Sequence, residues 1–118
     1  MTEHVTQAHW ETFFNDLAKK YHGFEARLEV IGRNFGDQEV AVWLPFSGIS
    51  YDPRHHQIFV ALGDISSHYP VHLTHAINSP HTVAVRYAPN GEVSSLLITS
   101  GDKTELLVTL RRQPQLTA

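Results

Sequence analysis

The first regular pattern along the chain is a helical one. Large apolar residues recur at alternating spacings of three and four positions, which places them on one face of an α-helix, with polar residues on the other. Gly23 follows this segment, and glycine readily adopts the left-handed conformation that ends helices. The spacing therefore predicts a helix over residues 7–21 whose apolar face carries Trp10, Phe13, Phe14, Leu17 and Tyr21.

After Gly23 the period of the pattern changes to two, which is the period of a half-buried β-strand. Apolar and charged residues alternate over residues 24–30 and predict a first strand. Glycines and polar residues at 32–37 predict a loop, and renewed alternation over 40–46 predicts a second strand. Because Pro45 has no backbone N–H, its end of this strand is expected at a sheet edge or a bulge.

Turn-forming residues divide the remainder of the chain into short segments. After a bend at 47–48 and a turn at 52–54, apolar patterns predict strands at 57–62, 71–77, 82–88, 93–99 and 104–111. Residues 65–70 are predicted to be irregular, and segments 89–91 and 101–103 to be hairpin turns. Three consecutive apolar residues, Leu96, Leu97 and Ile98, predict a central strand that is buried on both faces.

These elements predict an α+β fold with a single domain over residues 1–118. One N-terminal amphipathic helix is expected to pack its aromatic face on an antiparallel sheet of six or seven strands. The sheet is expected to be either strongly bent or a partly open barrel, and to end in a β-meander.

Composition and charge narrow the possible functions. The chain has 118 residues, no cysteine and a formal net charge of −3. The lack of cysteine excludes disulfides, thiolate metal sites and thiol nucleophiles, and the scattered basic residues argue against nucleic-acid binding. No apolar run approaches the ~20 residues of a membrane span, and the N-terminus has no signal-peptide pattern. We therefore expect a cytoplasmic protein with neither nucleic acid nor a membrane as its partner.

Three segments carry a resemblance to a known family. They are LPFSGISYD at 44–52, VALGD at 60–64 and HLTHAINSP at 72–80. Taken in this order, the patterns L-P-x-x-G-I, L-G-D and H-x-T-H-x-I-x-x-P resemble a family of small bacterial proteins of unknown function. The resemblance implies a stand-alone bacterial domain, and it implies no catalytic residue or cofactor.

The chain is rich in histidine, at 9 of 118 residues, so metal binding has to be considered. His72 and His75 lie in a segment predicted to be extended, where residues three apart point to opposite faces and cannot act as joint ligands. His55 and His56 lie in a predicted turn, where adjacent side chains diverge. We therefore predict no metal site and no cofactor, and we expect His75 to be half-buried on the apolar side of its strand.

Candidate acid–base chemistry is confined to one group of residues near predicted strand ends, Tyr51, Asp64, His72 and His75. The chain has no nucleophile-elbow, phosphate-loop or dinucleotide-binding motif, so no particular reaction is indicated. The alternative interpretation is therefore a small-ligand or metal-binding domain that uses the histidines of residues 55–81. Such a domain could also be an enzyme.

The leading interpretation is a non-enzymatic module for protein interaction or self-association. Trp43 falls on the strand face opposite Val42 and Leu44, and Ala41 and Phe59 are expected to join it in an apolar patch outside the core. A small sheet covered by one helix also leaves strand edges exposed. We therefore predict a homodimer, or an unidentified protein partner, bound through the Trp43 and Phe59 face or through an edge strand.

Overall fold

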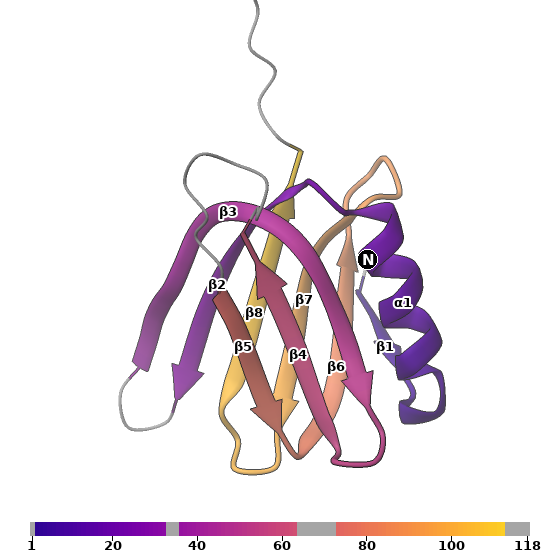
Figure 1. Cartoon of the computed structure of the whole chain (residues 1–118), viewed down its shortest axis with the longest axis vertical. Coiled ribbons are helices and arrows are strands. Elements are labelled where there is room, and N and C mark those ends of the chain that lie inside the picture. The colour runs from indigo at the N-terminus through magenta and orange to yellow at the C-terminus, as the bar shows by residue number, and fades with distance from the viewer. Residues whose placement is uncertain (1, 33–35, 64–72, 113–118) are drawn as a thin grey trace, which may run out of the picture.

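The computed structural model describes residues 2–32, 36–63 and 73–112. Its elements are β1 (Thr2–Val5), a 3₁₀ turn (Gln7–His9), α1 (Trp10–Lys20), β2 (Glu25–Gly32), β3 (Gly36–Asp52), β4 (Gln57–Leu62), β5 (Leu73–Asn78), β6 (Pro80–Tyr87), β7 (Val93–Ser100) and β8 (Glu105–Arg111). The strands form one curled sheet in the order β1-β6-β7-β8-β2-β3-β4-β5, shown in Figure 1. Every pairing between neighbouring strands is antiparallel.

The prediction of an α+β fold with six or seven strands is wrong. The described residues are mostly sheet, with eight strands and a single α-helix of 11 residues. The strand missing from the prediction is β1, which pairs with β6 from Thr2 opposite Arg86 to Val5 opposite Val83. Four residues without apolar alternation carry no local signal of a strand, so only pairing with a distant segment creates this one.

The C-terminal part of the prediction is confirmed, because β6, β7 and β8 follow one another as an antiparallel meander. In β7, Leu96 and Ile98 are buried, whereas Leu97 on the opposite face is only half-buried, so the expected burial on both faces is incomplete. No helix in the described ranges is long and apolar enough to span a membrane.

A single strand, β3, takes the place of the predicted second strand and of the bend that follows it. Over its 17 residues it pairs first with β2 and then with β4. Its register against β2 shifts twice around Leu28, and Trp43 there has a φ of 52°. Bulges bend a strand and increase its twist, and Figure 1 shows β3 arching over the top of the molecule. Pro45 lies just beyond these bulges, although on a central strand rather than an edge.

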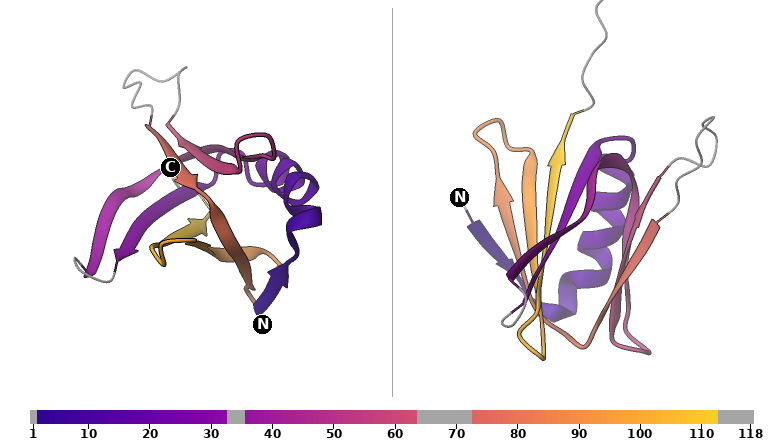
Figure 2. Two further views of the ribbon diagram at one scale, coloured as in Figure 1. Left: turned by 90° about the horizontal axis from the view of Figure 1, so that it is seen from below. Right: turned by 90° about the vertical axis from the view of Figure 1, so that its left-hand side faces the viewer.

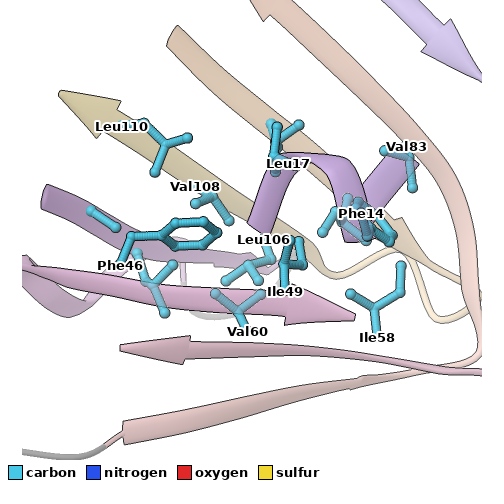
Figure 3. Close-up of a cluster of buried hydrophobic side chains, with 14 of the residues drawn as sticks. Phe14, Leu17, Phe46, Ile49, Ile58, Val60, Val83, Leu106, Val108 and Leu110 are labelled. Atoms are coloured by element: carbon cyan, nitrogen blue, oxygen red, sulfur yellow. The ribbon is translucent and has the colours of Figure 1, made fainter. Parts of the chain in front are cut away.

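The curled sheet encloses the core together with α1. Figure 2 shows the helix lying along one side of the sheet, and Figure 3 shows Phe14 and Leu17 pointing in among strand residues such as Ile49 and Val60. The predicted apolar face of the helix is largely confirmed, because Trp10, Phe14, Leu17 and Tyr21 are buried and Phe13 is partly buried. Gly23 has a φ of +90°, as expected for a residue that ends a helix.

Three turns meet at one corner of the sheet. Ser79, between β5 and β6, donates its N–H to the carbonyl of His56 in the β3–β4 turn at 3.0 Å. The N–H of Gly101, in the β7–β8 turn, donates to the carbonyl of Ser79 at 2.9 Å. His56, Ser79 and Lys103 all have positive φ, a conformation that costs roughly 1–2 kcal/mol for residues other than glycine. This corner ties the β3–β4 turn and the β5–β6 connection to the β7–β8 hairpin, and it positions the site described next.

Candidate functional site

A cleft opens between the edge strand β5 and the β7–β8 hairpin, next to this corner. Its volume is about 190 Å³, which corresponds to roughly six water molecules at ~30 Å³ each. We call it the β5 cleft. It is lined by Val30 of β2, by His75, Ala76, Ile77 and Asn78 of β5, and by Ser100, Asp102, Thr104, Glu105 and Leu106 of the β7–β8 hairpin.

One wall of the β5 cleft is the strand that carries His75. Residues of β5 alternate between the two faces of the sheet, and His75 lies opposite Val60 while Ile77 lies opposite Ile58. Val60, Ile58 and Ile77 are all buried, so His75 is on the apolar side of the sheet, as predicted. Burial lowers the pKa of His75 below its ordinary value, because desolvation disfavours the charged imidazolium.

The opposite wall of the β5 cleft is acidic. The Asp102 carboxylate accepts hydrogen bonds from the hydroxyl of Ser100 and, at 2.9 Å, from the N–H of Thr104. These bonds hold the pKa of Asp102 below its usual range, so this exposed carboxylate is ionised at neutral pH. Glu105 is a further lining residue, and none of the described lining residues is a lysine or an arginine. The ionised Asp102 carboxylate therefore stands at the rim of a cleft whose apolar floor is formed by Val30, Ile77 and Leu106, and we call this edge the acidic rim.

The edge of β5 that pairs with no described strand runs along this cleft. Among the described strands β5 pairs only with β4, in a regular register without a bulge. Its sequence, LTHAIN, contains no proline, lysine, arginine or carboxylate. The other edge, β1, has four residues and carries Glu3. Natural sheets protect their edges with short strands, charges, prolines and bulges, and among the described edge strands β5 has fewer of these features than β1.

Tyr51 belongs to a different cluster, on β3, which β4 separates from β5. Its hydroxyl lies 2.8 Å from Nδ1 of His56 and accepts a hydrogen bond of 3.2 Å from the Gln7 side chain. Trp10 contacts Tyr51 edge to face, stacks on His56, and donates its indole N–H to the carbonyl of Val5 at 2.8 Å. This aromatic cluster fastens the N-terminal segment and α1 to the β3–β4 turn, which is a structural role.

The neighbouring pair Asp52 and His55 lies on the surface. Nδ1 of His55 is 2.7 Å from the Asp52 carboxylate, and this hydrogen bond lowers the pKa of Asp52. Within the described ranges, no group of three or more histidine, aspartate or glutamate side chains is arranged to hold a metal ion.

The prediction that Ala41 joins Trp43 in an apolar surface patch is wrong. Ala41 is buried in the core opposite Leu28, because the bulges in β3 reverse the alternation expected for an unbroken strand. Val40 and Val42 are exposed instead, at 39% and 50%. The surface that results carries two valines beside Trp43.

The Trp43 ring is itself covered. The guanidinium of Arg111 stacks on it, 3.8 Å from the ring centroid, and Nε of Arg111 donates to Glu25 at 2.9 Å. Phe59 is half-buried and lies opposite Ser50, seven positions further along β3, or roughly 20 Å at the usual rise of a strand. Trp43 and Phe59 therefore do not form one continuous patch.

The structure brings one of the predicted histidines, His75, into a cleft that Tyr51 does not line, since the Tyr51 hydroxyl bonds His56 and Gln7. Asp64 and His72 lie outside the described residues. The polar residues that face His75 were missed, because Asp102 and its neighbours were interpreted only as a hairpin turn. Their sequence contains no further signal, since their proximity to β5 depends on how the sheet curls.

Comparison with known proteins places the chain in a family. The model of a family of unknown function, DUF5335, matches residues 1–118. The chain belongs to this family. It is also 36% identical over 53 residues to an uncharacterised protein of Aquifex aeolicus, strain VF5, an alignment that covers 45% of this chain. The chain spans about half the length of that curated relative, at 48%. No solved structure matches it.

Proposed function

We propose that this DUF5335 chain is a non-enzymatic protein-interaction domain that binds an extended segment of another polypeptide along the free edge of β5. The observation that carries the proposal is the open edge itself, six residues long and without charge, proline or bulge. In strand addition of this kind, main-chain hydrogen bonds supply affinity and pockets beside the edge select side chains. The β5 cleft is a pocket in that position.

The size and contents of the β5 cleft favour interaction over catalysis. Its volume of about 190 Å³ is below the roughly 300–1,000 Å³ of typical small-molecule pockets, so it suits one side chain of a partner. The Ser100 hydroxyl donates to Asp102 rather than to His75, so these two residues do not form a nucleophile–base pair.

The homodimer predicted from the sequence is one form of this interaction. Two copies of β5 can pair antiparallel about a two-fold axis, which makes a second copy a possible partner segment. Self-association is therefore one outcome to be measured, by sedimentation of the purified chain across a dilution series.

Hydrogen exchange can locate the interface directly. Peptides that bind the chain would be selected from a displayed library of random sequences, and amide exchange would be measured with and without the selected peptide. We expect new protection at residues 73–78, because the outward-facing N–H groups of β5 would gain partners. Protection confined to Val40–Trp43 would instead assign binding to the exposed valines and would overturn the proposal.

Substitutions at the edge provide a second test. Thr74→Lys and Ala76→Lys change exposed positions of β5 and should abolish peptide binding while leaving the fold intact, since lysine is a typical edge protector. Thr82→Lys, at an exposed position of the interior strand β6, is the matched control and should bind as the parent does. Equal binding by all variants, or no peptide binding at about 1 mM, would show that β5 is not an interaction edge.

A further inference from the structure

We infer that the segment bound by β5 is basic, and that one of its lysine or arginine side chains enters the β5 cleft. This inference rests on the proposed function and names the chemistry of the partner. The four β5 residues His75–Asn78 are both the free edge and one wall of the cleft. A strand added to β5 would therefore run past the mouth of the cleft and bring its own side chains to it.

The charge of the β5 cleft favours a cationic side chain of the bound segment. Asp102 contributes an ionised carboxylate to the rim, Glu105 is a further lining residue, and the ten described lining residues include no lysine or arginine. Lys103, between them in sequence, is exposed and does not line the cleft. A carboxylate side chain would be repelled here, and a neutral one would leave the Asp102 carboxylate without a cationic partner.

The shape of the cleft matches a long cationic side chain. Ile77 and Leu106 are buried at the floor, with 7% and 2% of their surface exposed, and Val30 is half-buried beside them. The Asp102 carboxylate stands at the rim, where it is exposed to water. Lysine and arginine bury an apolar stem and keep their charged end in solvent. The apolar floor and acidic rim are complementary to those two parts.

A second copy of this chain fits the cleft less well than a basic partner does. The β5 sequence, LTHAIN, contains no lysine or arginine, so an antiparallel β5–β5 pair would supply no cation to either cleft. It would also bring the acidic rims of two copies close to one interface, where their charges repel each other. The formal net charge of each chain is already −3. Charge complementarity therefore points to a different polypeptide.

Matched synthetic peptides test this inference by fluorescence anisotropy. Each peptide alternates threonine and valine and differs only at its central residue, which is arginine, its neutral isostere citrulline, or glutamate. We expect the arginine peptide to bind about tenfold more tightly than the citrulline peptide, and the glutamate peptide to bind most weakly. The preference for arginine should shrink as salt screens the charges.

Variants of the rim identify the source of the preference. Glu105→Gln should weaken binding of the arginine peptide roughly fivefold and leave the citrulline peptide unaffected. Asp102→Asn, which keeps an acceptor oxygen for the turn, should act in the same direction. Glu11→Gln is the matched control, because it removes an exposed carboxylate from the first turn of α1, and it should change neither affinity.

The outcomes separate this inference from the proposed function. If all three peptides bind equally and Ala76→Lys abolishes binding of the citrulline peptide, strand addition stands and the cationic preference is wrong. If no peptide binds at about 1 mM, both are wrong. A preference for arginine that survives in both rim variants would show that the cation binds elsewhere, and would also overturn the inference.

Discussion

The curled sheet has two sides, one packed against α1 and the other bordered by the β5 cleft. On one side, α1 inserts Phe14 and Leu17, with 0% and 4% of their surface exposed, and the Tyr21 hydroxyl accepts a hydrogen bond of 2.8 Å from the N–H of Val93. On the other side, β5 pairs with β4 alone among the described strands and borders a cleft that holds half-buried His75. We call these the closed side and the open side.

The two sides differ in what surrounds their side chains and backbone polar groups. On the closed side, apolar side chains fill the space and an aromatic cluster fastens the helix to the β3–β4 turn. On the open side, carboxylates and an edge of main-chain groups face water, which stabilises the fold little and leaves them available to a partner. We therefore expect the stability of the domain to depend on the closed side, and binding of a partner to depend on the open side.

Removing residues 1–22 is expected to have the largest effect. This truncation deletes β1 and α1, including four buried side chains that each contribute roughly 1.5–3 kcal/mol, in a domain stable by about 5–15 kcal/mol. The remainder should be unfolded in circular dichroism and show no cooperative thermal transition. A cooperative melt of the truncated chain would show that the open side is stable by itself.

Phe14→Ala should destabilise the chain by about 3–5 kcal/mol, because Phe14 is fully buried and its truncation leaves a cavity. The matched substitution on the open side, Val30→Ala in the cleft floor, should cost about 1 kcal/mol or less, since Val30 is only half-buried. Denaturant unfolding measures both. Equal losses would remove the distinction between the two sides.

Tyr51→Phe should cost about 1 kcal/mol, because it removes the hydroxyl that bonds both His56 and Gln7. Gln7→Ala breaks one of the same bonds, so the loss in the double variant should be smaller than the sum of the two single losses. Unfolding free energies of the four proteins in this cycle measure the coupling. Additive losses would mean that the aromatic cluster does not fasten the N-terminal segment.

The smallest expected effect is a change in pH dependence at His75. Burial puts the folded pKa of His75 below the ordinary value of 6.5, so the unfolded chain binds the proton more readily. Stability is therefore complete above pH 6.5 and falls as the pH drops through that value toward the folded pKa. His75→Gln should reduce this loss in denaturant midpoints measured on acidification.

His4→Gln is the control for that experiment, because His4 is exposed on β1. It should leave the pH dependence unchanged. An equal response from both variants, or stability that rises on acidification, would show that His75 is solvated or paired with a carboxylate.

Local periodicity was enough to predict several features of this protein. The spacing of Trp10, Phe14, Leu17 and Tyr21 identified the buried face of α1, and alternation with turn residues identified the C-terminal meander. The half-buried position of His75 followed from the same rule. In each case, the signal is a periodicity carried by neighbouring residues of one helix or one strand, so it does not depend on which distant segments pack against them.

Tertiary structure alone decided the strand β1, the path of β3 and the β5 cleft. β1 exists because it pairs with β6, about eighty residues away, and the two register shifts in β3 moved Ala41 into the core and Val42 to the surface. The cleft combines Val30, His75 and Asp102 from three distant segments. A bulge reverses which residues face inward, and a curled sheet decides which turns meet. Neither leaves a periodic signal, because both depend on pairing between distant strands.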